Sequence, residues 1–252
     1  MLHTAFKAGA GLALTLASCL IPLTVAHAGP DGNVESPIVE EGERELDIKF
    51  GTARPRQGGR ESALSVGLGF GMNSWWATEV YAKANRQTPG GWRFDAVEWE
   101  NRFQLTETGK YPVDLGWVIE LEHPQDRSEG WELSFGPLLQ AELTPKLVAN
   151  LNLFFTRNYR ASTPSAMNMD YQWQLRYRWK PELEWGAQGF GSLGPWRQWA
   201  AADQQEHKAG PAVFGKLRLD AHQAINYNAA WLLANNATTP RNTLRLQVEY
   251  EY

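Results

Sequence analysis

Apolar and polar residues alternate along most of this chain with a period of two, which favours β-strands over helices. The alternation is especially regular over residues 64–72, 113–121, 147–155 and 244–252. Counted in this way, the chain contains about twelve such segments of roughly ten residues each, a pattern typical of membrane-spanning β-barrels. Every strand would then present one apolar face and one polar face.

The connections between these segments also alternate in length. Short turns are expected at residues 73–74, 108–110, 144–146, 180–181 and 220–222, and longer loops at 54–61, 124–130, 159–168 and 191–210. An even strand number with alternating turns and loops predicts an all-β fold: a closed antiparallel up-and-down transmembrane barrel of about twelve strands, with both termini periplasmic. The alternative, a soluble β-sandwich, requires no such rhythm.

Aromatic residues fall at the expected strand ends, where the two membrane interfaces would lie. The C-terminal residue Tyr252 is aromatic too, and it resembles the signal by which the barrel-assembly machinery recognises outer-membrane proteins. The expected partners are therefore outer-membrane lipid and that machinery. One interface would hold Trp75, Trp76, Tyr111, Trp179 and Tyr250, and the other Trp92, Trp131, Tyr159 and Trp231.

The first 28 residues have the features of a secretory signal peptide: Lys7, an apolar run, and Ala26-His27-Ala28 as the cleavage site. Two alternatives are a transmembrane helix and a lipoprotein signal with Cys19 as the lipidated residue. Residues 29–44 would form a flexible periplasmic lead-in, rich in glycine, proline and acidic residues. Residues 45–252 would form the barrel.

Charge and cysteine content narrow the function. Removing Lys7 leaves 23 Lys+Arg against 28 Asp+Glu, a net charge of −5, which argues against nucleic acid as a partner. Cys19 is the only cysteine, so a chain cleaved after Ala28 would have no disulfide and no thiolate chemistry.

The polar faces of the strands carry charges sorted by sign. Two readings remain open: the charges could cross-link a filled lumen, with Arg178 paired to Glu184, or create a transverse field in a narrow pore. In a pore they would set selectivity. The acidic members are Glu98, Glu100, Glu120, Glu122 and Glu132, and the basic members are Arg176, Arg178, Lys216, Arg218 and Arg245.

Three alternating glycines, Gly67, Gly69 and Gly71, would leave space on the lumen side of one strand for something that packs closely. The candidate is the long loop 191–210, which contains a helix-compatible stretch with Trp196 and Trp199. We expect this loop to fold inward and narrow the pore.

Enzymatic chemistry has little support. A lipid hydrolase, the lesser alternative, needs a serine hydrogen-bonded to a histidine, yet His123 is placed on the lipid side of its strand, and Ser128 and Ser134 lie in a loop and on the lumen side. No cluster of His and Cys suggests a metal. We expect no enzyme, no cofactor and no metal.

Three short stretches, 39–44, 210–217 and 242–252, resemble uncharacterised proteobacterial outer-membrane barrels, similar to those grouped as components of a phenol-degradation pathway. The resemblance implies transport of small, aromatic compounds and transfers no functional residue. The expected function is a narrow passive channel for a small solute in the cell outer membrane. The alternative is a non-conducting structural or interaction barrel.

Overall fold

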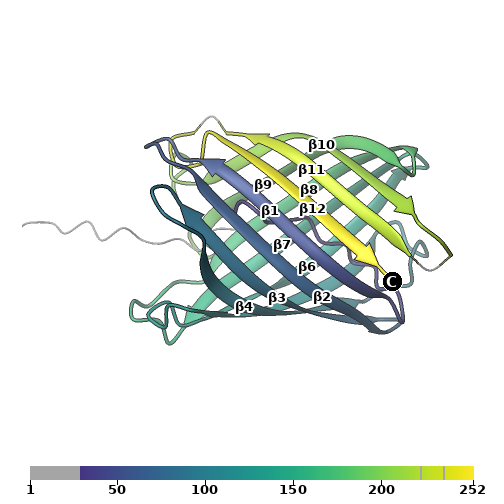
Figure 1. Cartoon of the computed structure of the whole chain (residues 1–252), viewed down its shortest axis with the longest axis horizontal. Coiled ribbons are helices and arrows are strands. Elements are labelled where there is room, and N and C mark those ends of the chain that lie inside the picture. The colour runs from purple at the N-terminus through teal and green to yellow at the C-terminus, as the bar shows by residue number, and fades with distance from the viewer. Residues whose placement is uncertain (1–28, 222, 235) are drawn as a thin grey trace, which may run out of the picture.

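The structure is a computed structural model that describes residues 29–221, 223–234 and 236–252. The signal peptide expected over residues 1–28, Cys19 and His222 lie outside the described residues. Twelve strands close into one antiparallel barrel (Figure 1). They are β1 (Arg44–Arg54), β2 (Glu61–Asn73), β3 (Trp76–Gln87), β4 (Arg93–Gln104), β5 (Asp114–Pro124), β6 (Trp131–Thr144), β7 (Leu147–Tyr159), β8 (Asn168–Lys180), β9 (Leu183–Pro195), β10 (Glu206–Arg218), β11 (Ala224–Leu233) and β12 (Asn242–Glu251).

Each strand pairs with its neighbours in sequence, and β1 pairs with β12 to close the sheet. Closure leaves no strand edge unpaired, which is the condition for a sheet in lipid. The start of β1 and the end of β12 lie together, because the backbone nitrogen of Tyr252 donates a hydrogen bond to the carbonyl of Arg44 at 2.9 Å. The expected all-β, closed, twelve-stranded fold is confirmed. Among the described residues, no helix has the length and apolar character needed to cross a membrane.

The two faces of the sheet follow the alternation in the sequence. Outward side chains such as Leu68, Val80 and Leu244 are about half exposed although they are apolar. Inward side chains such as Asn152 and Arg245 are polar and at most 1% exposed. An apolar exterior around a polar interior is the arrangement expected for a barrel surrounded by lipid, and opposite to that of a soluble protein.

Most of the expected turns are confirmed, since residues 74–75, 145–146 and 181–182 alone connect their strands. Two expectations are wrong. The turn placed at 108–110 belongs to a longer connection over 105–113, and the loop placed at 191–210 is only 196–205 because β9 and β10 extend further. Cross-strand hydrogen bonding continues through the glycines of this region, which the alternation pattern alone did not reveal.

The largest departure from expectation is residues 29–43. They form no periplasmic tail. The segment turns back from β1 and runs inside the barrel as a separate stretch of chain; at its end, Gly42 and Glu43 exchange backbone hydrogen bonds with Gly71 of β2 at 2.8 and 2.9 Å. Glu40 lies beside Gly71 near the start of β1, and Gly29 lies beside Ala63 near the other end. Its alternate residues Asp31, Asn33, Glu35 and Val39 are buried. We call residues 29–43 the luminal segment.

The glycines of β2 leave space for close packing on the lumen side, as expected, but not for the expected loop. A Cβ on Gly71 would overlap the carbonyl oxygen of Glu40, so this glycine makes room for the luminal segment. A Cβ on Gly67 would meet the ring of Tyr81 and one on Gly69 the side chain of Glu45. Loop 196–205 is not what packs there.

Candidate functional site

The luminal segment is attached to the barrel wall by a few polar contacts. Ser65 donates a hydrogen bond to Asp31 (Oγ to Oδ2, 2.6 Å), and Lys49 pairs with Glu35 (Nζ to Oε1, 3.5 Å). Asn152 donates to the carbonyl of Glu35 at 3.1 Å. The backbone nitrogen of Val39 donates to Gln104 Oε1 at 2.8 Å. These contacts reach β1, β2, β4 and β7, so the segment is held from several sides of the lumen.

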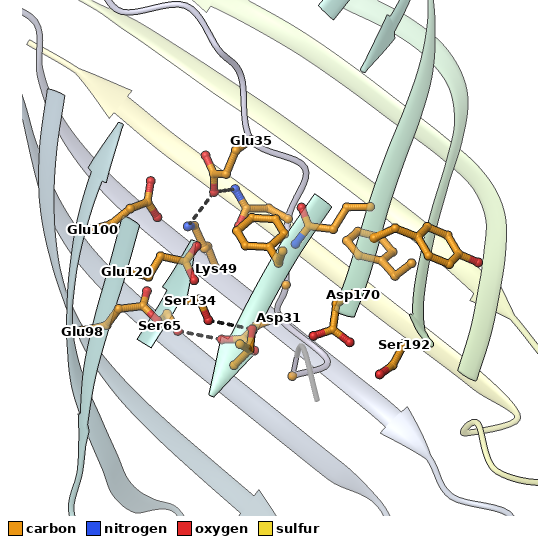
Figure 2. A pocket seen from close by; sticks show the side chains of 18 of the residues that line it. Asp31, Glu35, Lys49, Ser65, Glu98, Glu100, Glu120, Ser134, Asp170 and Ser192 are labelled. Atoms are coloured by element: carbon orange, nitrogen blue, oxygen red, sulfur yellow. Dashed lines mark hydrogen bonds and ion pairs between the residues drawn. The ribbon is translucent and has the colours of Figure 1, made fainter. Parts of the chain in front are cut away.

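A cavity of about 140 Å³ remains between the luminal segment and the wall. Figure 2 shows Glu98, Glu100 and Glu120 on one side of it, Asp31 near the middle, and Asp170 with Ser192 on the other side. Glu98 and Glu100 come from β4 and Glu120 from β5, while Asp170 and Ser192 are cross-strand partners in β8 and β9. Residues far apart in sequence therefore meet in one polar chamber.

The predicted acidic residues are brought together around this cavity. Glu98 and Glu122 both pair with Lys83, at 3.0 and 2.5 Å from its Nζ. Glu100 lies 3.3 Å from the Nε of Arg102. Glu120 and Glu132 also line the cavity. The acidic residues that the sequence predicted for the lumen thus form one continuous region of β4, β5 and β6.

Three of the predicted basic residues each pair with a different carboxylate, so they do not form one group. Arg176 pairs with Glu184 at 3.2 Å, and Lys216 pairs with Glu251 at 2.7 Å. Arg178 pairs with Glu142 at 2.5 Å, so the expected Arg178–Glu184 pair is wrong. The register pairs Arg176 with Gly186 and Tyr177 with Trp185 and then shifts before Lys180, so the side chain of Arg176 reaches Glu184 diagonally across the two strands.

The last two basic residues differ from each other. Arg245 is 1% exposed, donates from Nη1 to Gln188 at 2.5 Å, and lies over the ring of Phe190. Arg218 is exposed at the end of β10. Of these two residues, Arg245 lies in the interior of the lumen and Arg218 does not.

A second charged network was missed by the sequence reasoning. Arg102 lies within 4.0 Å of carboxylate oxygens of four residues, which come from the luminal segment, β1, β3 and β4. Tyr81 donates to Asp47 at 3.0 Å and also to Glu79. The signal was present, because Glu45, Asp47 and Lys49 alternate with the apolar residues of the first strand. The four carboxylate residues around Arg102 are Glu35, Glu45, Glu79 and Glu100.

The two tryptophans of the expected constriction do not narrow the lumen. Trp196 is 44% exposed and packs edge-on against Phe155, an outward residue of β7, with ring centroids 6.1 Å apart. Trp199 is 56% exposed. Neither lines the cavity. The luminal segment takes the position that had been expected for this loop.

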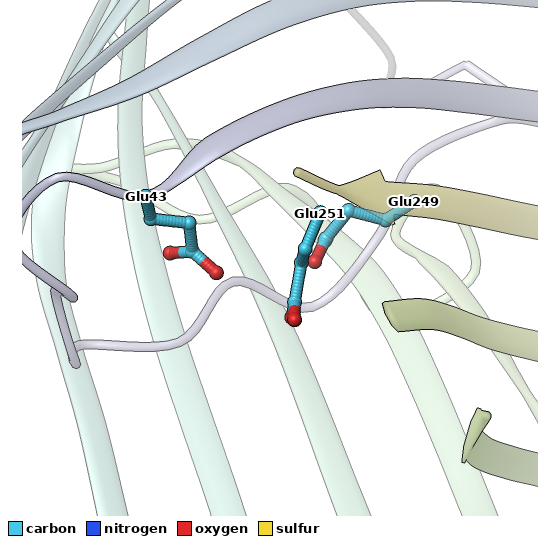
Figure 3. A group of neighbouring side chains, drawn as sticks. All are labelled: Glu43, Glu249 and Glu251. Carbon is cyan, nitrogen blue, oxygen red and sulfur yellow. The ribbon is translucent and has the colours of Figure 1, made fainter. Parts of the chain in front are cut away.

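Three carboxylates lie together at the end of the barrel where β1 starts: Glu43, Glu249 and Glu251 (Figure 3). Their oxygens lie within 4.8 Å of one another. Donors from the chain already serve two of them, since Asn226 donates to Glu249 at 2.6 Å and Lys216 pairs with Glu251. Burial, followed by the neighbouring carboxylates Glu40, Glu251 and Glu249, raises the pKa of Glu43 to about 7. The arrangement is a network of internal contacts, and we assign no metal to it.

The histidines that the structure describes do not form a hydrolase site. His123 packs edge-on against Trp131, with ring centroids 4.4 Å apart. His207 shares a hydrogen bond with Tyr171 and another with Gln205. Within the described residues, no serine hydroxyl is hydrogen-bonded to either ring, as a serine nucleophile would have to be.

Comparison with known proteins adds information about the fold. No protein-family model matches the chain, and no curated protein matches its sequence. Among solved structures, it is similar to the COG4313 outer membrane channel from Pseudomonas putida F1, with a TM-score of 0.60, 13% identity, and coverage of 87% of this chain and 97% of that one. It is also similar to the KdgM porin, with a TM-score of 0.52, 10% identity, and coverage of 82% of this chain and 98% of that one. For the NanC porin the TM-score is 0.50 and the identity 11%, with coverage of 82% of this chain and 98% of that one. At these identities the likeness establishes an outer-membrane barrel fold.

Proposed function

We propose that this protein is a narrow passive channel for a small solute in the outer membrane. The observation that carries the proposal is the polar lumen, which holds a cavity beside a luminal segment that is not part of the sheet. Residues 31–39 are attached through side chains of the wall, so they can move without breaking the barrel, because every strand keeps both of its neighbours. The three solved barrels to which the chain is similar are named as channels or porins, which agrees with this function.

The luminal segment determines how narrow the channel is. It occupies the lumen from the level of Gly71 to the level of Ala63, so solute must pass through the remaining cavity or wait until the segment moves. A barrel of twelve strands lies between those of eight, which side chains fill, and those of sixteen, which leave an open channel. Residues 29–43 therefore reduce a lumen of intermediate width.

The test is single-channel conductance in a planar bilayer of the protein purified from outer membranes, compared with a variant lacking residues 29–40. We expect small or brief openings from the intact protein and larger, steady openings from the shortened one. Heat-dependent mobility on a gel confirms that each barrel is folded. Silence from both folded proteins would refute the channel and favour the alternative, a non-conducting structural or interaction barrel.

A further inference from the structure

The cavity beside the luminal segment has an uneven charge. Eight carboxylate residues and three lysines line it, which leaves a formal excess of five negative charges. Two of the lysines are already paired with carboxylates: Lys49 with Glu35 and Asp47, and Lys83 with Glu98 and Glu122. The cavity thus has few positive groups left for an anion and many carboxylates for a cation.

A second observation comes from a buried carboxylate with acceptor capacity to spare. Asp170 is 9% exposed and Ser192 is 7% exposed, and both line the cavity from adjacent strands. The Oδ1 atom of Asp170 and the Oγ atom of Ser192 are buried, and the Ser192 hydroxyl is the hydrogen-bonding partner of the Asp170 carboxylate. A carboxylate can accept several hydrogen bonds, so one that is served by a single hydroxyl beside a cavity can accept a further donor from a ligand.

Aromatic rings complete the surroundings. Phe154, Phe190 and Tyr81 line the cavity and are at most 5% exposed. Two of these rings already make cation–π contacts with lysines. The Nζ of Lys49 lies 4.1 Å from the centroid of the Tyr81 ring, and the Nζ of Lys208 lies 5.7 Å from the centroid of the Phe190 ring. Aromatic faces beside carboxylates are the chemistry that recognises organic ammonium groups.

We infer that the luminal cavity is a binding site for a small organic ammonium ion, with Asp170 and Glu120 as ligand carboxylates from opposite sides and aromatic rings between them. This inference rests on the proposed channel and names the class of its solute. The luminal segment contributes Asp31 and Glu35 to the same cavity, so the segment that narrows the lumen also forms part of the site. An anionic solute would meet the excess of carboxylates and be repelled.

The test uses three probes that share one ring and differ in charge: benzylammonium, benzyl alcohol and benzoate. Binding to the purified intact protein in detergent micelles is measured by isothermal titration calorimetry. We expect benzylammonium to bind at least about tenfold more tightly than either other probe, because a charged donor gains most from an ionised acceptor. Asp170→Asn and Glu120→Gln should each weaken benzylammonium binding by about tenfold.

Glu107→Gln is the matched control, because Glu107 is exposed in the 105–113 connection and pairs with the exposed Lys110 there. It should leave the affinity unchanged. Equal affinity for the three probes, tighter binding of benzoate, or no binding of any probe would overturn the inference. Full affinity in both cavity variants would do the same. The binding assay does not depend on conduction, so the two proposals can fail separately. A barrel that conducts no ions but still binds benzylammonium preferentially would refute the proposed channel and support the proposed binding site.

Discussion

Gly51 lies in close contact with the luminal segment, so adding a single methyl group at this position tests how firmly that segment is held. A Cβ on Gly51 would lie 2.5 Å from the backbone nitrogen of Asp31 and would overlap the carbonyl of Pro30. Carbon atoms pack at about 3.5–4.0 Å. In Gly51→Ala the segment must therefore move by on the order of 1 Å, since backbone atoms, unlike the end of a flexible side chain, cannot rotate away.

The size of the effect follows from the contacts that hold the segment. Five hydrogen bonds and ion pairs attach residues 31–39 to the wall, and at about 1 kcal/mol each they favour the seated position by about 5 kcal/mol. Overpacking by one methyl group costs about 1–3 kcal/mol. That would raise the population of the displaced segment by about 5- to 150-fold without emptying the lumen.

The assay is maleimide labelling of Asn33→Cys, a position that is 8% exposed in the seated segment. Residues 29–252 contain no cysteine, so the label reports this site alone. Labelling should be about 5- to 150-fold faster in the Gly51→Ala background. Gly91→Ala is the control, because a Cβ there meets nothing within 4 Å. An unchanged labelling rate in Gly51→Ala would refute the seated position of the segment.

Three further predictions concern stability. Arg102→Gln leaves up to four carboxylates without their shared cation and should lower the free energy of unfolding in urea by about 3–5 kcal/mol; a change below 1 kcal/mol would contradict the network. Val80→Arg places a charge on an outward residue that is 50% exposed and should destabilise the barrel in lipid vesicles by about 2–4 kcal/mol; stability equal to wild type would mean that this face does not contact lipid. The pKa of Glu43 is about 7 in the folded protein against an ordinary 4.5, so the fold binds the proton more tightly and stability should fall as pH rises from 4.5 to 7, then level off. Urea unfolding across this pH range should show a smaller decline in Glu43→Gln, and an equal decline would exclude Glu43 as its source.

The sequence was sufficient for the barrel and for most of its wall. Alternation with period two is a local property, and it placed Val80 and Leu244 outward and Glu100 and Arg245 inward without knowledge of any contact. The even strand number and the rhythm of turns then required closure. The acidic residues of neighbouring strands could be grouped for the same reason, because they share one face and adjacent positions.

Contacts across the lumen were decided only by the tertiary structure. Residues 29–43 are rich in glycine, proline and acid and have no apolar face, so locally they resemble a solvated tail. Their place inside the barrel depends on partners such as Ser65, Gln104 and Asn152, which lie on three strands and converge only when the sheet closes. Likewise, Arg176 and not Arg178 pairs with Glu184, because the register of β8 and β9 shifts between Tyr177 and Lys180, an irregularity that alternation does not reveal. The periodicity of a strand specifies which face a residue occupies, and closure of the barrel specifies what it meets there.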